Sequence, residues 1–195
     1  MALTLLTVFA AAILTHNMAL TYLLGMCPFI SLSKSLRTAS GMGFAVIFVV
    51  TLTAVINWPI YNLILVPTGT ELIYYIVFII VIAASVQLVE MIMERFFPPL
   101  QAAFGIFLPL ITVNCTVLAV SLFMVIRDYD YLTSIIFAFG SAVGWIVAIV
   151  IVAAINEKLK LIGEIPSGMK GPGIIMVISG ILALAFLGFA GVVNL

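Results

Sequence analysis

Six apolar stretches, each about as long as a membrane is thick, constrain this chain more than any other feature of its sequence. A helix needs ~20 consecutive apolar residues to cross the hydrocarbon core of a bilayer. Because a helix satisfies its own backbone hydrogen bonds there, continuous runs of this length predict transmembrane helices. The six predicted helices are Thr4–Leu24, Ala39–Trp58, Ile73–Met93, Phe104–Ile126, Leu132–Ile155 and Ile174–Val193.

The segments between these stretches are short, so we predict a single all-α transmembrane domain over residues 1–195. Only 7% of the residues are charged, against roughly 25% in a typical soluble domain. The net charge of zero gives no indication of a nucleic-acid partner. No basic segment precedes the first stretch and no small-residue cleavage site follows it, so we expect that stretch to be retained as a helix.

Basic residues are distributed unevenly among the connecting segments. The first, third and fifth connections hold six of them, and the second and fourth hold only Arg127. Cytoplasmic connections of membrane proteins are enriched in Lys and Arg, so we expect the odd-numbered connections to face the cytoplasm and both termini to face outward. The six residues are Lys34, Arg37, Arg95, Lys158, Lys160 and Lys170.

The two halves of the chain, about 1–97 and 98–195, resemble each other weakly. The segment Gly41–Ile47 opens the second predicted helix, and Gly140–Ile146 opens the fifth. Three helices per half is an odd number, so the second half must cross the membrane in the opposite direction. The sequence therefore predicts six transmembrane helices in two inverted three-helix repeats, an arrangement found in transporters whose functional site lies near the midplane.

The chain contains two cysteines, Cys27 and Cys115, one in or directly after the first predicted helix of each half. Gly25 and Pro28 flank the first cysteine, and Pro109 precedes the second by six positions. Gly and Pro weaken a helix, and loosened backbone inside a membrane is tolerated only where protein or a cavity surrounds it. We therefore expect the first helix of each half to be interrupted, with both thiols facing the protein interior.

Three interpretations of the cysteines remain open from spacing alone: ordinary buried thiols, a disulfide, or metal ligands. Free cysteine packs readily as a small apolar side chain. An iron–sulfur cluster normally needs four thiolates, so a cluster bound by this chain would have to be shared with another chain.

Glu90 and Gln87 are the main polar candidates inside the apolar stretches. They are three residues apart and therefore share one face of the third predicted helix. Intramembrane carboxylates are costly and often functional, so this face is a candidate for a Na⁺ or proton path. The alternative is that Glu90 reaches the membrane interface and pairs with Arg95 or another base.

We expect the remaining polar side chains to be structural. Asn17 and Asn114 are expected to hydrogen-bond across helices, and Asp128 and Asp130 to lie in a solvated outer connection. His16 is a weaker candidate for a ligand. The chain has no glycine-rich dinucleotide loop, so NADH and flavins would have to be bound by partner subunits.

Several motifs resemble one family of membrane redox subunits. They are Leu24–Phe29, Arg95–Leu100 and, most specifically, Gly105–Cys115 (GIFLPLITVNC). Over nearly its whole length the chain is similar to the NqrE subunits of the Na⁺-translocating NADH:quinone reductase (Nqr) and to the RnfA subunits of the Rnf ferredoxin:NAD⁺ oxidoreductase. Phe96–Pro99 is more similar to the Nqr subunit, and the segment ending at Gly191 to the Rnf subunit. Both complexes stay open, with a slight preference for Nqr.

The resemblance implies that Cys27 and Cys115 bind half of an intramembrane [2Fe–2S] cluster. The other half would come from a homologous six-helix subunit of opposite orientation, like NqrD or RnfE. The chain would help pass electrons from a cytoplasmic flavin and iron–sulfur subunit to an outer flavin subunit, coupled to Na⁺ export, in a six-subunit-type translocase of the bacterial inner membrane. It would not be catalytic alone, and NADH and the flavins would be bound by its partners. A stand-alone secondary transporter and a passive scaffold subunit are the alternatives.

Overall fold

The chain is helical wherever its structure is described. The computed structural model describes residues 2–33, 35–69, 73–96, 112, 114–162 and 171–188, and these residues contain helices and turns but no strand. The all-α prediction is therefore confirmed for this part of the chain. The elements are α1 (Ala2–Leu14), α2 (Met26–Leu32), α3 (Leu36–Ile60), η1 (Tyr61–Leu65), α4 (Val66–Thr68), α5 (Tyr74–Phe96), α8 (Cys115–Ile126), α9 (Tyr131–Ile162) and α10 (Pro172–Leu187).

Three helical segments in the described residues are long and apolar enough to cross a membrane, as expected for a multi-pass membrane protein. They are Leu36–Thr68, Tyr74–Ile92 and Tyr131–Leu161, and each overlaps one predicted helix. The other three predicted helices each overlap a shorter apolar helix. These shorter helices are Leu5–Leu14, Cys115–Ile126 and Pro172–Leu187. The predicted segments 104–111 and 189–193 lie outside the described residues.

The prediction of one continuous first helix, Thr4–Leu24, is wrong in its second half. Helix α1 ends at Leu14, and turns lead from there to α2. The side-chain oxygen of Asn17 accepts hydrogen bonds from the backbone N–H groups of Ala19 and Leu20, at 3.0 and 3.3 Å. Leu23 has a φ of 55°, which a right-handed helix does not include. The interruption expected in the first half is therefore present between α1 and α2.

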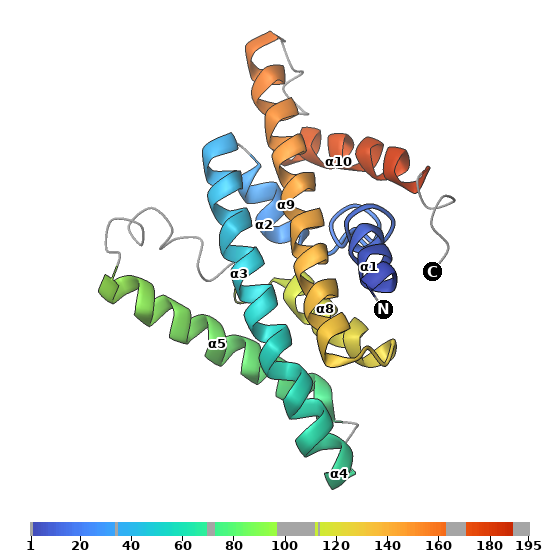
Figure 1. The fold of residues 1–195 in the computed structure, drawn as a ribbon. Coiled ribbons are helices and arrows are strands. Elements are labelled where there is room, and N and C mark those ends of the chain that lie inside the picture. Colours follow the sequence, from blue (N-terminus) through green and yellow to red (C-terminus); the bar gives the residue numbers. More distant parts are fainter. Residues whose placement is uncertain are drawn as a thin grey trace.

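The two long helices α3 and α9 lie side by side and form the centre of the molecule (Figure 1). A Cβ added to Gly43 would overlap the side chain of Ile146, so the glycine allows these two helices to approach closely. Gly144 plays the same part between α9 and α1, because its added Cβ would lie 3.2 Å from the carbonyl oxygen of Ala12. Gly43 and Gly144, one from each of the two similar motifs, thus mark sites of close helix packing.

Two hydrogen bonds connect the halves of the chain in a crossed manner. In the first, Nδ2 of Asn57 on α3 donates to Oγ of Ser121 on α8, at 2.9 Å. In the second, Nδ2 of Asn156 on α9 donates to the carbonyl oxygen of Ser33 at the end of α2, at 3.0 Å. Each long helix is thereby bound to a short helix of the other half.

The connections group at the two ends of the α3–α9 pair. At one end, Arg37 and Glu157 line the same surface recess, which brings the first and fifth connections together. At the other end, Nε1 of Trp58 donates to the carbonyl oxygen of Tyr129 at 2.9 Å, which joins the second and fourth connections. This grouping agrees with the alternation predicted from the basic residues, while the side of the membrane that each end faces stays a prediction.

Candidate functional site

Both cysteines lie at the start of a helix. Cys27 is the second residue of α2, and Cys115 is the first residue of α8. Both side chains are exposed, and neither forms a disulfide. The expectation that the thiols face the interior is therefore wrong for this chain taken by itself, because both cysteine side chains are exposed although neighbouring residues such as Pro28 and Thr116 are buried. Exposed thiols in an apolar membrane protein are open to a neighbouring chain.

A close contact at Gly25 brings the two cysteine motifs together. A Cβ added to Gly25 would overlap Oγ1 of Thr116 and would lie 2.8 Å from both Oδ1 of Asn114 and Nε1 of Trp145. Gly25 also has a φ of 75°, in the left-handed region that favours glycine. The residues around the second cysteine therefore pack directly against the turn that leads into the first. We call Gly25, Asn114, Thr116 and Trp145 the glycine contact.

Asn114 determines where α8 begins. Its extended backbone and its side-chain oxygen, which accepts the N–H of Thr116 at 3.0 Å, make it the N-cap of that helix. The expectation that Asn114 bonds across helices is therefore wrong in the described residues. Asn17 does make such a bond, because its Nδ2 donates to the carbonyl oxygen of Gly144 on α9 at 2.8 Å. That prediction is confirmed.

His16 lies in a polar group at the other end of α8. Its Nδ1 is 3.0 Å from the hydroxyl of Tyr22 and 3.5 Å from Nη2 of Arg127. Nη1 of Arg127 in turn donates to the hydroxyl of Tyr129 at 3.0 Å. These contacts give His16 a structural explanation without a ligand.

The polar candidates of the third predicted helix lie on α5. Gln87 is exposed there and Glu90 is half-buried, while Arg95 is exposed in the last turn. Their part in an ion path stays a prediction.

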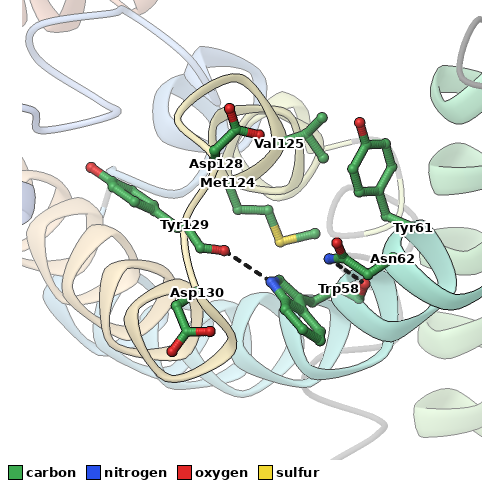
Figure 2. A pocket seen from close by; sticks show the side chains of 8 residues that line it. All are labelled: Trp58, Tyr61, Asn62, Met124, Val125, Asp128, Tyr129 and Asp130. Atoms are coloured by element: carbon green, nitrogen blue, oxygen red, sulfur yellow. Dashed lines mark hydrogen bonds between the residues drawn. The ribbon is translucent and has the colours of Figure 1, made fainter. Parts of the chain in front are cut away.

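A cavity of about 300 Å³ lies between the end of α3 and the turn after α8. Figure 2 shows that the carboxylates of Asp128 and Asp130 point away from each other at its rim, so they do not form a joint cation site. Both side chains are exposed, as expected for a solvated connection. Trp58 closes one wall through its hydrogen bond to Tyr129.

Within the described residues, no three His, Cys, Asp or Glu side chains gather closely enough to hold a metal ion. The role of Cys27 and Cys115 as ligands of a shared metal centre stays a prediction. Sequence reasoning missed Thr116 and Trp145 as parts of the site. Thr116 could have been noticed because it directly follows a cysteine. Nothing in the sequence distinguishes Trp145 from the other residues of its apolar stretch.

Comparison with known proteins supports the resemblance over the whole chain. A sequence profile described as "Rnf-Nqr subunit, membrane protein" matches residues 5–193. The E subunit of the Na(+)-translocating NADH-quinone reductase of Proteus mirabilis (strain HI4320) is 47% identical over 193 residues, covering 96% of this chain and 97% of the relative. The same subunit of Serratia proteamaculans (strain 568) is 47% identical with the same coverage. The chain therefore belongs to the Rnf-Nqr family of membrane subunits.

Proposed function

We propose that this chain is the E-type subunit of a Na⁺-exporting NADH:quinone reductase of the bacterial inner membrane. In this role it helps pass electrons from a cytoplasmic flavin and iron–sulfur subunit to an outer flavin subunit. The relatives named above are Nqr subunits, and this favours the Nqr complex over Rnf. The observation that carries the proposal is the pair of exposed cysteines at two helix starts that pack together at the glycine contact.

The residues at this site fit a [2Fe–2S] cluster shared with a partner. Such a cluster takes four thiolates, and Cys27 and Cys115 supply two. Their exposure leaves room for two cysteines of a homologous six-helix subunit, and the absence of a Cβ at Gly25 allows the two motifs to approach. When bound, the cluster supplies one-electron transfer inside the membrane. This chain's residues hold it on one side, orient it and exclude water.

We infer inverted repeats of about 1–97 and 98–195 from matching positions in the two halves. Ser33 and Ser121 each lie six residues after a cysteine, and Asn57 and Asn156 each lie sixteen residues after the first glycine of the similar motifs. These are the four residues of the crossed hydrogen bonds. With the odd-numbered connections in the cytoplasm, both termini face outward, and the homologous partner has the opposite orientation.

The test is iron binding by the complex co-expressed with the homologous partner. Cys27→Ser and Cys115→Ser should each abolish iron content and visible absorbance while the subunits still assemble, because each variant removes one of four ligands. Ser31→Ala, on the exposed face of α2, is the matched control and should retain both. Full iron content in either cysteine variant would sink the proposal and favour a passive scaffold or a stand-alone transporter.

A further inference from the structure

Three buried polar atoms around Gly25 have no hydrogen-bond partner among the described residues. They are Nδ2 of Asn114, Oγ1 of Thr116 and Nε1 of Trp145. The three side chains are 3%, 0% and 0% exposed. All three residues meet at the position that a Cβ on Gly25 would occupy, Thr116 and Trp145 through the unpaired atoms themselves and Asn114 through its capping oxygen Oδ1. Buried polar groups in proteins are nearly always paired, so this concentration beside both cysteines needs an explanation.

Two of these three atoms are hydrogen-bond donors only. The indole Nε1 of Trp145 carries a hydrogen and has no lone pair to accept with. The amide of Asn114 is oriented by its cap, because the backbone N–H of Thr116 donates at 3.0 Å and must therefore face Oδ1. Its NH₂ group is thus the atom without a partner. The site presents N–H groups that require an acceptor.

Neither of these N–H groups forms a hydrogen bond within the described residues. The carbonyl oxygen of Gly25 already accepts the N–H of Phe29, at 3.3 Å, in the first turn of α2. The indole of Trp145 is also held in place, since it lies edge-on to the ring of Phe29 with centroids 6.2 Å apart and planes at 79°. Its N–H therefore cannot turn toward a distant acceptor without disturbing the buried core.

We propose that Trp145 and Asn114 are positioning residues that donate N–H hydrogen bonds to sulfur atoms of the cluster held by Cys27 and Cys115, and thereby raise its reduction potential. This role rests on the proposed function. Sulfur atoms of a cluster carry negative charge and accept hydrogen bonds, and the bonds strengthen when an added electron increases that charge. Donors fixed before the cluster binds stabilise its reduced form most effectively.

The chain offers a matched pair of variants for the test, because it contains two tryptophans. Trp145→Phe removes the N–H beside the cysteines and keeps an aromatic ring in the core. Trp58→Phe makes the same chemical change near the C-terminal end of α3, where the indole N–H donates to the carbonyl oxygen of Tyr129. Both variants are purified as the complex with the homologous partner, and the cluster potential is titrated by visible absorbance and EPR.

Trp145→Phe should retain iron and lower the midpoint potential, while Trp58→Phe should leave the potential unchanged. The deuterium shift of the Fe–S stretching bands in resonance Raman spectra should also shrink in Trp145→Phe only. If Trp145→Phe does not retain the cluster, Asn114→Ser serves in its place, because it keeps a capping oxygen and removes the amide donor without adding a charge. A lowered potential there supports the proposal.

An unchanged potential with unchanged deuterium shifts in the cluster-retaining variant would overturn the proposal and assign the donors to water inside this chain. The proposed function would survive that result, since iron would still depend on the cysteines. Failure of the proposed function has a different signature, namely iron that persists in Cys27→Ser or is absent from the complex with both cysteines intact.

Discussion

The two crossed hydrogen bonds join corresponding positions of the two halves, yet they use different atoms. Asn57 donates to the side-chain hydroxyl of Ser121, whereas Asn156 donates to the backbone carbonyl of Ser33. The lengths of the short helices explain the difference. Helix α2 ends at Leu32, so the carbonyl of Ser33 lies at a helix end, where carbonyl groups lack intrahelical partners. Helix α8 continues to Ile126, so Ser121 has only its hydroxyl to offer. The two serine positions should therefore tolerate different substitutions.

The largest effect is expected when the orientation of the first half in the membrane is tested directly. A cysteine introduced at Ala2 should be labelled by a membrane-impermeant thiol reagent from outside, and one introduced at Ser35 should not. The reason is the excess of basic residues in the odd-numbered connections. Each introduced cysteine should be either fully labelled or not labelled. The control is the chain that carries only its two native cysteines. The reverse pattern would contradict the orientation.

Gly25→Ala should disrupt the contact between the two cysteine-bearing helices. The left-handed backbone alone costs ~1–2 kcal/mol for a residue with a Cβ, and the overlap with Thr116 adds to it. Gly69→Ala is the control, because Gly69 has a similar φ of 68° but no described atom within 4 Å of an added Cβ. Thermal unfolding in detergent should show a clearly larger loss for Gly25→Ala, together with loss of iron. Equal losses would mean that the close contact is unimportant.

Ser121→Ala and Ser33→Ala test the asymmetry of the crossed bonds. Ser121→Ala removes the acceptor of Asn57 and should destabilise the protein by about 1 kcal/mol. Ser33→Ala keeps the carbonyl that Asn156 uses and removes a hydroxyl with no described partner, so its effect should stay within roughly 0.5 kcal/mol. Chemical denaturation of the two variants measures both values. A larger effect for Ser33→Ala would contradict the explanation from helix length.

The smallest structural effect is expected at Glu90. Helix α5 carries this half-buried carboxylate, while α10, the last described helix of the second half, carries no charged residue. Glu90→Gln should leave assembly and iron unchanged and lower Na⁺-stimulated turnover, because an ion path would lose its anionic oxygens. Gln87→Ala on the same helix face should give a weaker change. A Na⁺ titration identical to that of the unmodified complex would make Glu90 a structural residue.

The sequence predicted the long helices well and the short ones poorly. Apolar runs located α3, α5 and α9 to within three residues, except that α9 continues seven residues beyond the predicted Ile155, because length and hydrophobicity decide such helices. An interruption of the first helix was expected near Gly25 and Pro28, but its start after Leu14 was not, because it depends on hydrogen bonds to Asn17 and on the left-handed backbone of Leu23, and neither stands out in an apolar run. The cysteine motifs were recognised in the sequence. The contact between them through Gly25 forms only in the tertiary structure, so the sequence alone did not predict it. The crossed asparagines were recognisable from their equal spacing in the two halves.

The length of α8 limits how deep Cys115 lies in the membrane. The helix has twelve residues, and at 1.5 Å per residue it is no longer than ~18 Å. It ends beside Arg127, at the same end of the molecule as the contact between Trp58 and Tyr129. The apolar interior of a bilayer is ~30 Å thick, so α8 traverses little more than half of it. An electron carrier at Cys115 would thus be remote from water on both sides, and groups that exchange electrons with it must reach inward from each surface.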